Sequence, residues 1–218
     1  HNVPSITTLE GMQGKLATAA AKCITNYGFF IGATEDNVAD LQEAVGTREN
    51  PIAIPGICGI KIFMGVSTGT LLVSDKTALE RIFTETAGLI AVHAEDEDRM
   101  AERRKLIEGR TDIAAHAYYR DDITALMATK LSVELAHKTG HRLHILHLTS
   151  GIEADYLNDH CTLPSMADGY PIITTEVLPQ HLTFDETDVD EHGVRLQMNP
   201  PIRYAKDREI LWQRLVDG

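Results

Sequence analysis

Short runs of apolar residues alternate along this chain with longer stretches in which apolar positions recur at helical spacing. The apolar runs predict five buried strands, near residues 28–33, 59–65, 89–94, 142–148 and 171–177. The intervening stretches predict helices over about residues 7–24, 36–45, 75–87, 95–108, 121–139, 152–158 and 206–216. Strand followed by helix, repeated in this way, predicts an α/β fold with a parallel sheet wound in one sense.

Local signals refine this outline. Thr7 and Glu10 have the spacing of a capping box, so Thr7 is predicted to be the N-cap of the first helix. The charged stretch 95–108 predicts a solvated helix face, and the acidic stretch 185–191 predicts a surface loop. The loop 66–70 directly follows a buried strand and is placed to line a site.

Lys61 stands in the middle of the apolar run 59–65, where an ammonium group loses hydration that apolar neighbours cannot replace. Such a lysine is expected to form an ion pair, to lose its proton or to react. The neutral amine can add carbon dioxide and become a carbamate, which is a carboxylate able to bridge two metal ions. The alternative is a lysine at a strand end whose ammonium group reaches water.

His93 and His147 occupy matching positions, near the C-terminal ends of the next two predicted strands. Each of them alone suits a hydrogen-bonded core histidine. Three successive strands that present Lys or His at this end predict a shared site, because parallel α/β folds place their sites there. Imidazole is a common zinc ligand. His144 has the opposite strand parity and is predicted to face the helix layer in a structural role.

Composition narrows the class of partner. The formal net charge of −12 and the pI near 5.2 argue against nucleic acid or an anionic membrane as a partner. The 218 residues, 43% of them hydrophobic, have the composition of a soluble globular domain, and we expect one structural unit over residues 1–218. No apolar run reaches the length of a membrane span, and the start shows no signal-peptide pattern. The cysteines are widely spaced, which indicates reduced thiols and a cytoplasmic location. They are Cys23, Cys58 and Cys161.

Taken together, five motifs resemble the amidohydrolase superfamily in order and spacing. Within it they are most similar to the cyclic-amide branch, which contains dihydroorotases, allantoinases and hydantoinases. The resemblance covers essentially the whole chain, and its motifs are Gly59-Ile60-Lys61-Ile62-Phe63-Met64-Gly65, Val92-His93-Ala94-Glu95-Asp96, the segment from His144 to Ser150, the segment from Thr175 to Leu182, and Met198-Asn199-Pro200-Pro201-Ile202-Arg203.

The resemblance implies hydrolysis of a cyclic amide with two zinc ions. Lys61, as its carbamate, would bridge the two ions and is the catalytic candidate, while His93 and His147 would bind the second, more exposed ion. Asn199 would contact the substrate ring. Its place before two prolines favours dihydroorotase, which interconverts carbamoyl aspartate and dihydroorotate in pyrimidine biosynthesis. His181 is left open, as either a helper at the rim of the site or a loop residue. Five further histidines are predicted at the surface, and they are His116, His137, His141, His160 and His192.

Two motifs of the family are missing from this sequence, the early His-x-His and the late Thr-Asp-His. We therefore expect an incomplete (β/α)8 TIM-type barrel with about five of its eight strands, and an internal segment that is inactive alone. An allantoinase or a hydantoinase is the first alternative, and a non-catalytic dihydroorotase-like scaffold is the second. The expected partner is a small cyclic amide, and homo-oligomerisation is left open.

Overall fold

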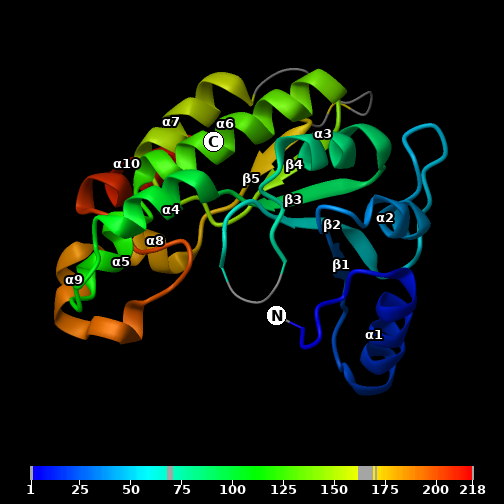
Figure 1. The fold of residues 1–218 in the computed structure, drawn as a ribbon, viewed down its shortest axis with the longest axis horizontal. Helices are drawn as coiled ribbons and strands as arrows, with labels where there is room; N and C mark the ends of the chain where they lie inside the picture. Colours follow the sequence, from blue (N-terminus) through cyan, green and yellow to red (C-terminus); the bar gives the residue numbers. More distant parts are fainter. Residues whose placement is uncertain (1, 68–70, 162–168, 170, 218) are drawn as a thin grey trace.

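The computed structural model describes residues 2–67, 71–161, 169 and 171–217. Residues 68–70 of the loop predicted over 66–70 lie outside this range, as do residues 162–168. Five parallel strands form one sheet in the order β1-β2-β3-β4-β5 (Figure 1). The strands are β1 Phe29–Gly32, β2 Ile57–Phe63, β3 Leu89–His93, β4 Arg142–Ile145 and β5 Ile173–Thr175.

Helices fill every connection between consecutive strands. Helix α2 joins β1 to β2, α3 joins β2 to β3, the helices α4 to α6 join β3 to β4, and α7 joins β4 to β5. The helical bounds are α1 Leu9–Lys22, α2 Val38–Val45, α3 Lys76–Glu85, α4 Glu97–Lys105, α5 Ala114–Tyr119, α6 Asp122–Thr139, α7 Gly151–His160, α8 Pro179–Thr183, α9 Glu186–His192, the 3-10 helix η1 Gly193–Leu196, and α10 Ala205–Asp217.

The two faces of the sheet differ in chemistry. One face packs against the helices through fully buried aliphatic side chains, each of which stabilises the fold by about 1.5–3 kcal/mol. These side chains are Ile60, Ile62, Ile90, Val92, Leu143 and Ile145. Successive strand residues point to opposite faces, so the other face carries Lys61, Ala91 and His144, which are aligned across β2, β3 and β4.

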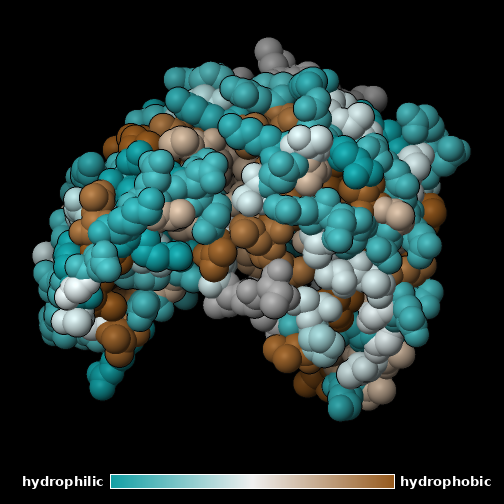
Figure 2. All heavy atoms as spheres, viewed as in Figure 1, coloured by the Kyte–Doolittle hydropathy of each residue, from teal (hydrophilic) through white to brown (hydrophobic). Residues whose placement is uncertain are grey.

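The sheet does not close on itself. Figure 1 shows an arch in which α6 and α7 follow the outer side, the sheet lies beneath them, and α1 and α9 stand at the two feet. Strands β1 and β5 are its two edges, as expected for an incomplete barrel with about five strands. The space-filling view shows the hollow between the feet of the arch, with apolar side chains gathered at its upper end (Figure 2).

Element types were mostly predicted correctly, whereas several boundaries were wrong. The N-cap of α1 is Thr8, whose Oγ1 accepts a hydrogen bond from Gly11 N at 3.1 Å, so the predicted cap at Thr7 was one residue early. The stretch predicted as a surface loop, 185–191, forms helix α9, because Asp185 and Asp188 make a reciprocal capping box. Within the described residues, no helix is long and apolar enough to cross a membrane.

Candidate functional site

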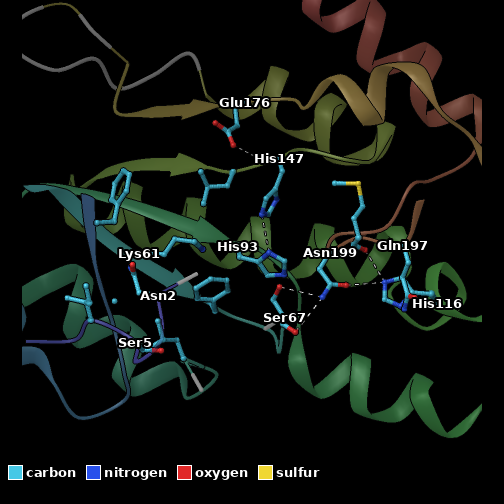
Figure 3. Close-up of a pocket in the computed structure, with 17 residues that line it drawn as sticks. Asn2, Ser5, Lys61, Ser67, His93, His116, His147, Glu176, Gln197 and Asn199 are labelled. Carbon is cyan, nitrogen blue, oxygen red and sulfur yellow. Dashed lines mark hydrogen bonds between the residues drawn. The ribbon is translucent and has the colours of Figure 1, made fainter. Parts of the chain in front are cut away.

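Strands β2, β3 and β4 end at a cavity of about 730 Å³. Lys61, His93 and His147, which were expected to converge, all line this cavity (Figure 3). Lys61 lies inside β2 and His93 is the last residue of β3. His147 was predicted inside a strand, but β4 ends at Ile145, so this histidine lies in the loop that follows.

The imidazoles of His93 and His147 face each other. His93 Nδ1 lies 3.1 Å from His147 Nε2, and the two rings are nearly perpendicular at 77°. Two nitrogens bound to one tetrahedral zinc at 2.0–2.1 Å are themselves about 3.3 Å apart. His147 Nδ1 is buried without a hydrogen-bond partner among the described residues. The pair therefore has the chemistry and nearly the spacing of two ligands to one metal ion.

Glu95 fixes which nitrogen of His93 carries the proton. Its Oε2 lies 2.6 Å from His93 Nε2, and Arg120 donates to the same carboxylate from Nη2 at 2.7 Å. Burial alone would raise the pKa of Glu95, but the hydrogen bonds from His93 and Arg120 hold it at about 2. The carboxylate is thus an obligatory acceptor, so His93 Nε2 donates to it and Nδ1 keeps its lone pair toward His147.

Glu176 holds the loop that carries His147. His147 has φ of 40°, a left-handed conformation that costs a non-glycine residue about 1–3 kcal/mol. Its backbone N–H donates to Glu176 Oε1 at 3.2 Å, and Leu148 N donates to Glu176 O at 2.7 Å. On the other side of the turn, Glu176 N donates to Ile145 O at 3.2 Å. This conformation turns the ring of His147 into the cavity.

Lys61 is partly buried beside these histidines. Burial lowers the pKa of Lys61 to about 7, against the opposing effect of the Glu176 carboxylate. The Nζ donates to Ile62 O at 2.8 Å and lies 3.7 Å from the centre of the Phe63 ring. Near neutral pH a large fraction of this amine is uncharged, which is the form that adds carbon dioxide.

Asn199 also lines this cavity. Its Oδ1 is 3.0 Å from His116 Nε2, and its Nδ2 lies 3.4 Å from Ser67 O and 3.5 Å from Ser67 Oγ (Figure 3). His116 Nε2 also lies 3.0 Å from Met198 O. Asn199 and His116 both line the cavity, so the prediction that His116 is a surface residue was wrong.

Among known proteins the chain is 31% identical over 224 residues to an allantoinase of Streptomyces avermitilis, covering 100% of this chain and 46% of that protein. It is 26% identical over 220 residues to a dihydroorotase of Methanosarcina mazei, covering 100% and 46%, and 28% identical over 206 residues to a D-phenylhydantoinase of Escherichia coli, covering 92% and 42%. The chain belongs to the cyclic-amide branch of the amidohydrolase superfamily. No family model matches it.

Solved structures give the same fold for this cyclic-amide amidohydrolase chain. An L-hydantoinase from Arthrobacter aurescens superposes with a TM-score of 0.85 at 23% sequence identity, covering 99% of this chain and 46% of that one. A dihydropyrimidinase from Brevibacillus agri superposes with a TM-score of 0.76 at 25% identity, covering 97% and 45%. The chain therefore spans about half the length of the relatives it matches.

Sequence reasoning missed other residues of the amidohydrolase site. Glu95 was assigned to a solvated helix face, yet it is fully buried, and its position two residues after His93 on the same side of the chain was the available signal. Arg120 is 2% exposed and was not singled out. Glu176 lies in a motif of the resemblance but was given no role of its own. His116 carried no pattern that distinguishes it from a surface histidine.

Two further histidines differ from expectation. His144 was predicted to face the helix layer, but it lies on the open face of the sheet, where Nδ1 is 2.8 Å from Thr174 Oγ1. The prediction counted alternating strand positions back from His147. This count fails because His147 has a left-handed backbone conformation, which ends the regular alternation of side chains. His141 was expected at the surface and is 3% exposed, with Nε2 3.2 Å from Thr86 O.

His181 is neither on the cavity wall nor in a loop. It lies in helix α8, is 3% exposed, and its Nε2 donates to Pro200 O at 3.3 Å. It therefore supports the backbone next to Asn199. Within the part of the chain that the structure describes, no group of three His, Cys, Asp or Glu side chains is placed to hold a metal ion. His93 and His147 would need the carbamate of Lys61 as a third ligand to hold a metal ion.

Proposed function

We propose that this chain forms the lysine and second-metal half of a zinc-dependent cyclic amide hydrolase, a dihydroorotase that interconverts carbamoyl aspartate and dihydroorotate. The observation that carries the proposal is the 3.1 Å approach of His93 Nδ1 to His147 Nε2, in the cavity that also receives Lys61. The names of the relatives, dihydroorotase, allantoinase and hydantoinase, support a cyclic amide as the substrate class. Zinc, a cytoplasmic location and the residue roles below are parts of this proposal.

The proposed chemistry begins with Lys61. Its neutral amine adds carbon dioxide, forming a nitrogen–carbon bond and releasing one proton to solvent, and the product is a carboxylate that can bridge two cations. His93 and His147 would bind one of these cations through Nδ1 and Nε2, the two atoms that face each other. Bound zinc would supply Lewis acidity, which lowers the pKa of water and polarises an amide carbonyl.

The other groups of the chain hold these ligands and the substrate. Glu95 keeps the proton of His93 on Nε2, and Glu176 holds the backbone of His147. Asn199 is placed to bind the ring. In the overall reaction one water molecule is consumed, a carbon–oxygen bond forms, the ring carbon–nitrogen bond breaks, and a proton passes to the leaving nitrogen. The motif that would move this proton in the family, Thr-Asp-His, is absent from this sequence.

Two alternatives share the site. Allantoinase is favoured by the 31% identical relative, whereas Asn199 before the proline pair favours dihydroorotase. A non-catalytic scaffold would retain the fold without turnover. A substrate panel of dihydroorotate, allantoin and hydantoin, assayed with the full-length protein that carries this segment, separates the three. Preferential turnover of dihydroorotate supports the proposal, and preference for allantoin or hydantoin replaces it. No turnover by the zinc-loaded protein would favour the scaffold.

A further inference from the structure

His116 fixes the orientation of the Asn199 amide. His116 Nε2 lies 3.0 Å from Met198 O, and a backbone carbonyl oxygen can only accept a hydrogen bond. Nε2 must therefore carry a proton. The same proton faces Asn199 at 3.0 Å, so the Asn199 atom on that side has to be the acceptor Oδ1. Burial lowers the pKa of His116, which favours the neutral ring with its single N–H at this position.

The other end of the amide is a donor turned toward the cavity. With Oδ1 held by His116, the Asn199 Nδ2 group lies on the side of Ser67, as Figure 3 shows. Its contacts there, 3.4 Å to Ser67 O and 3.5 Å to Ser67 Oγ, are longer than the usual 2.9–3.0 Å. Such long hydrogen bonds leave the two N–H groups available to a better placed acceptor. Asn199, Ser67 and His116 all line the cavity.

We propose that His116 is a specificity-determining positioning residue, which turns the Asn199 amide so that the cavity selects rings carrying an additional hydrogen-bond acceptor. The inference rests on the proposed function in that it takes this cavity as the substrate site. The acceptor is a carbonyl or carboxylate oxygen that is not part of the amide being hydrolysed. If a ring places an N–H group opposite Asn199 Nδ2, two hydrogen-bond donors face each other. Both groups then lack an acceptor, which disfavours binding of that ring.

The test uses matched pairs of rings that differ in the acceptor. Hydantoin and 4-imidazolidinone differ by the ring carbonyl that is not part of the hydrolysed amide, and dihydroorotate and dihydrouracil differ by the carboxylate. Isothermal titration calorimetry on the metal-free, full-length protein measures binding without turnover. One hydrogen bond corresponds to a change of roughly 2-fold to 10-fold in Kd. His116→Phe is expected to weaken binding of the acceptor-bearing member of one pair by about 5-fold, and to leave its partner unchanged. If the first pair is affected, Asn199 binds a ring carbonyl, and if the second pair is affected, it binds the carboxylate.

Two more variants complete the test. Asn199→Asp replaces the donor Nδ2 by an oxygen at nearly the same shape, and is expected to abolish the preference for the acceptor-bearing ring. His137→Phe, at an exposed position of α6, is the matched control and should bind all four rings as the unchanged protein does. Equal effects of His116→Phe on both members of each pair would overturn the inference, as would an unchanged preference in Asn199→Asp.

Kinetics separate this inference from the proposed function. In the zinc-loaded protein, His116→Phe should raise KM several-fold for the affected ring and leave kcat nearly unchanged, because the Asn199 contact is made in both the ground state and the transition state. If the unchanged protein hydrolyses none of the rings while the binding preference holds, the proposed function fails and the role of His116 stands. If turnover occurs and the preference is absent, the role of His116 fails and the function stands.

Discussion

Glu95 Oε2 and His93 Nε2 are 2.6 Å apart in a fully buried contact that also includes Arg120. Since an ionised carboxylate can only accept, this contact decides the tautomer of His93 and leaves Nδ1 as the atom available to the cavity. A carboxylate behind a metal-binding histidine commonly sets ring orientation and basicity. The contact thus links a buried ion pair to the geometry of the proposed metal ligands.

Glu95→Gln is expected to lower zinc affinity by about 10-fold to 100-fold, because a neutral amide no longer enforces the Nε2–H tautomer of His93. Competition with a chromophoric chelator measures the affinity. Glu153→Gln is the control, since Glu153 is also buried but bonds to Thr129 and Ser150, away from the histidines. Burial raises the pKa of Glu153, so a neutral amide suits its site. Equal loss of zinc in both variants would contradict a specific role of Glu95.

Lys61→Ala should remove the carbamate and most of the activity of the full-length protein. Short carboxylic acids such as acetate are expected to restore part of it, because they can replace the bridging carboxylate. Labelled bicarbonate and 13C NMR detect the carbamate directly in the unchanged protein. Full activity of Lys61→Ala with two metal ions bound would rule out the bridging role.

Glu176→Ala should weaken zinc binding by removing the acceptor that holds the backbone N–H of His147 at 3.2 Å. We expect a loss of about 10-fold, as for other groups that orient a metal ligand. Glu176→Gln keeps an acceptor oxygen at the same distance from the backbone and is expected to bind zinc nearly normally. Identical affinities in the two variants would show that this hydrogen bond does not position His147.

Asp121 is expected to make folding stability depend on acid. Burial raises the pKa of Asp121, but hydrogen bonds from Arg99 and Thr124 and the charge of Arg103 outweigh this effect and hold it at about 2. The folded protein therefore binds this proton less readily than the unfolded chain. Its stabilising contribution is present above about pH 4 and is lost as the pH falls toward 2. Asp121→Asn should lower Tm at pH 7 and flatten the decline of Tm between pH 4 and 2. If Tm declines equally in Asp121→Asn and in the unchanged protein, other groups cause the acid dependence.

The isolated 218-residue chain is expected to bind zinc weakly and to hydrolyse no dihydroorotate, because its sequence contains neither His-x-His nor Thr-Asp-His. The same segment within a chain that supplies both motifs should bind two zinc ions and turn over. Zinc titration and an activity assay on the two proteins decide the matter. Measurable turnover by the isolated chain would mean that other groups of this sequence replace the missing motifs.

Periodicity sufficed for the order of strands and helices, since an apolar run flanked by helical patterns has few alternatives in an α/β fold. It also placed Lys61 and His93 at one end of the sheet. It could not show that β4 stops at Ile145, because the left-handed turn at His147 leaves no mark in hydrophobicity. Glu95 was missed for a different reason. It opens a charged run that is typical of a solvated helix, and this pattern was given more weight than its position two residues after His93 on the same side of the chain.

The alternation of aliphatic and reactive side chains along β2 to β4 has an evolutionary consequence. Ile60 and Ile62 contact the helix layer while Lys61 between them faces the cavity, and on β3 Val92 contacts the helix layer while His93 faces the cavity. Substitutions of the helix-facing residues should therefore act on expression and folding, and substitutions of the cavity-facing residues on what the cavity binds. Selection can therefore change the ligand preference of the cavity one residue at a time. The packing of the same strand against the helices on its opposite side stays unchanged.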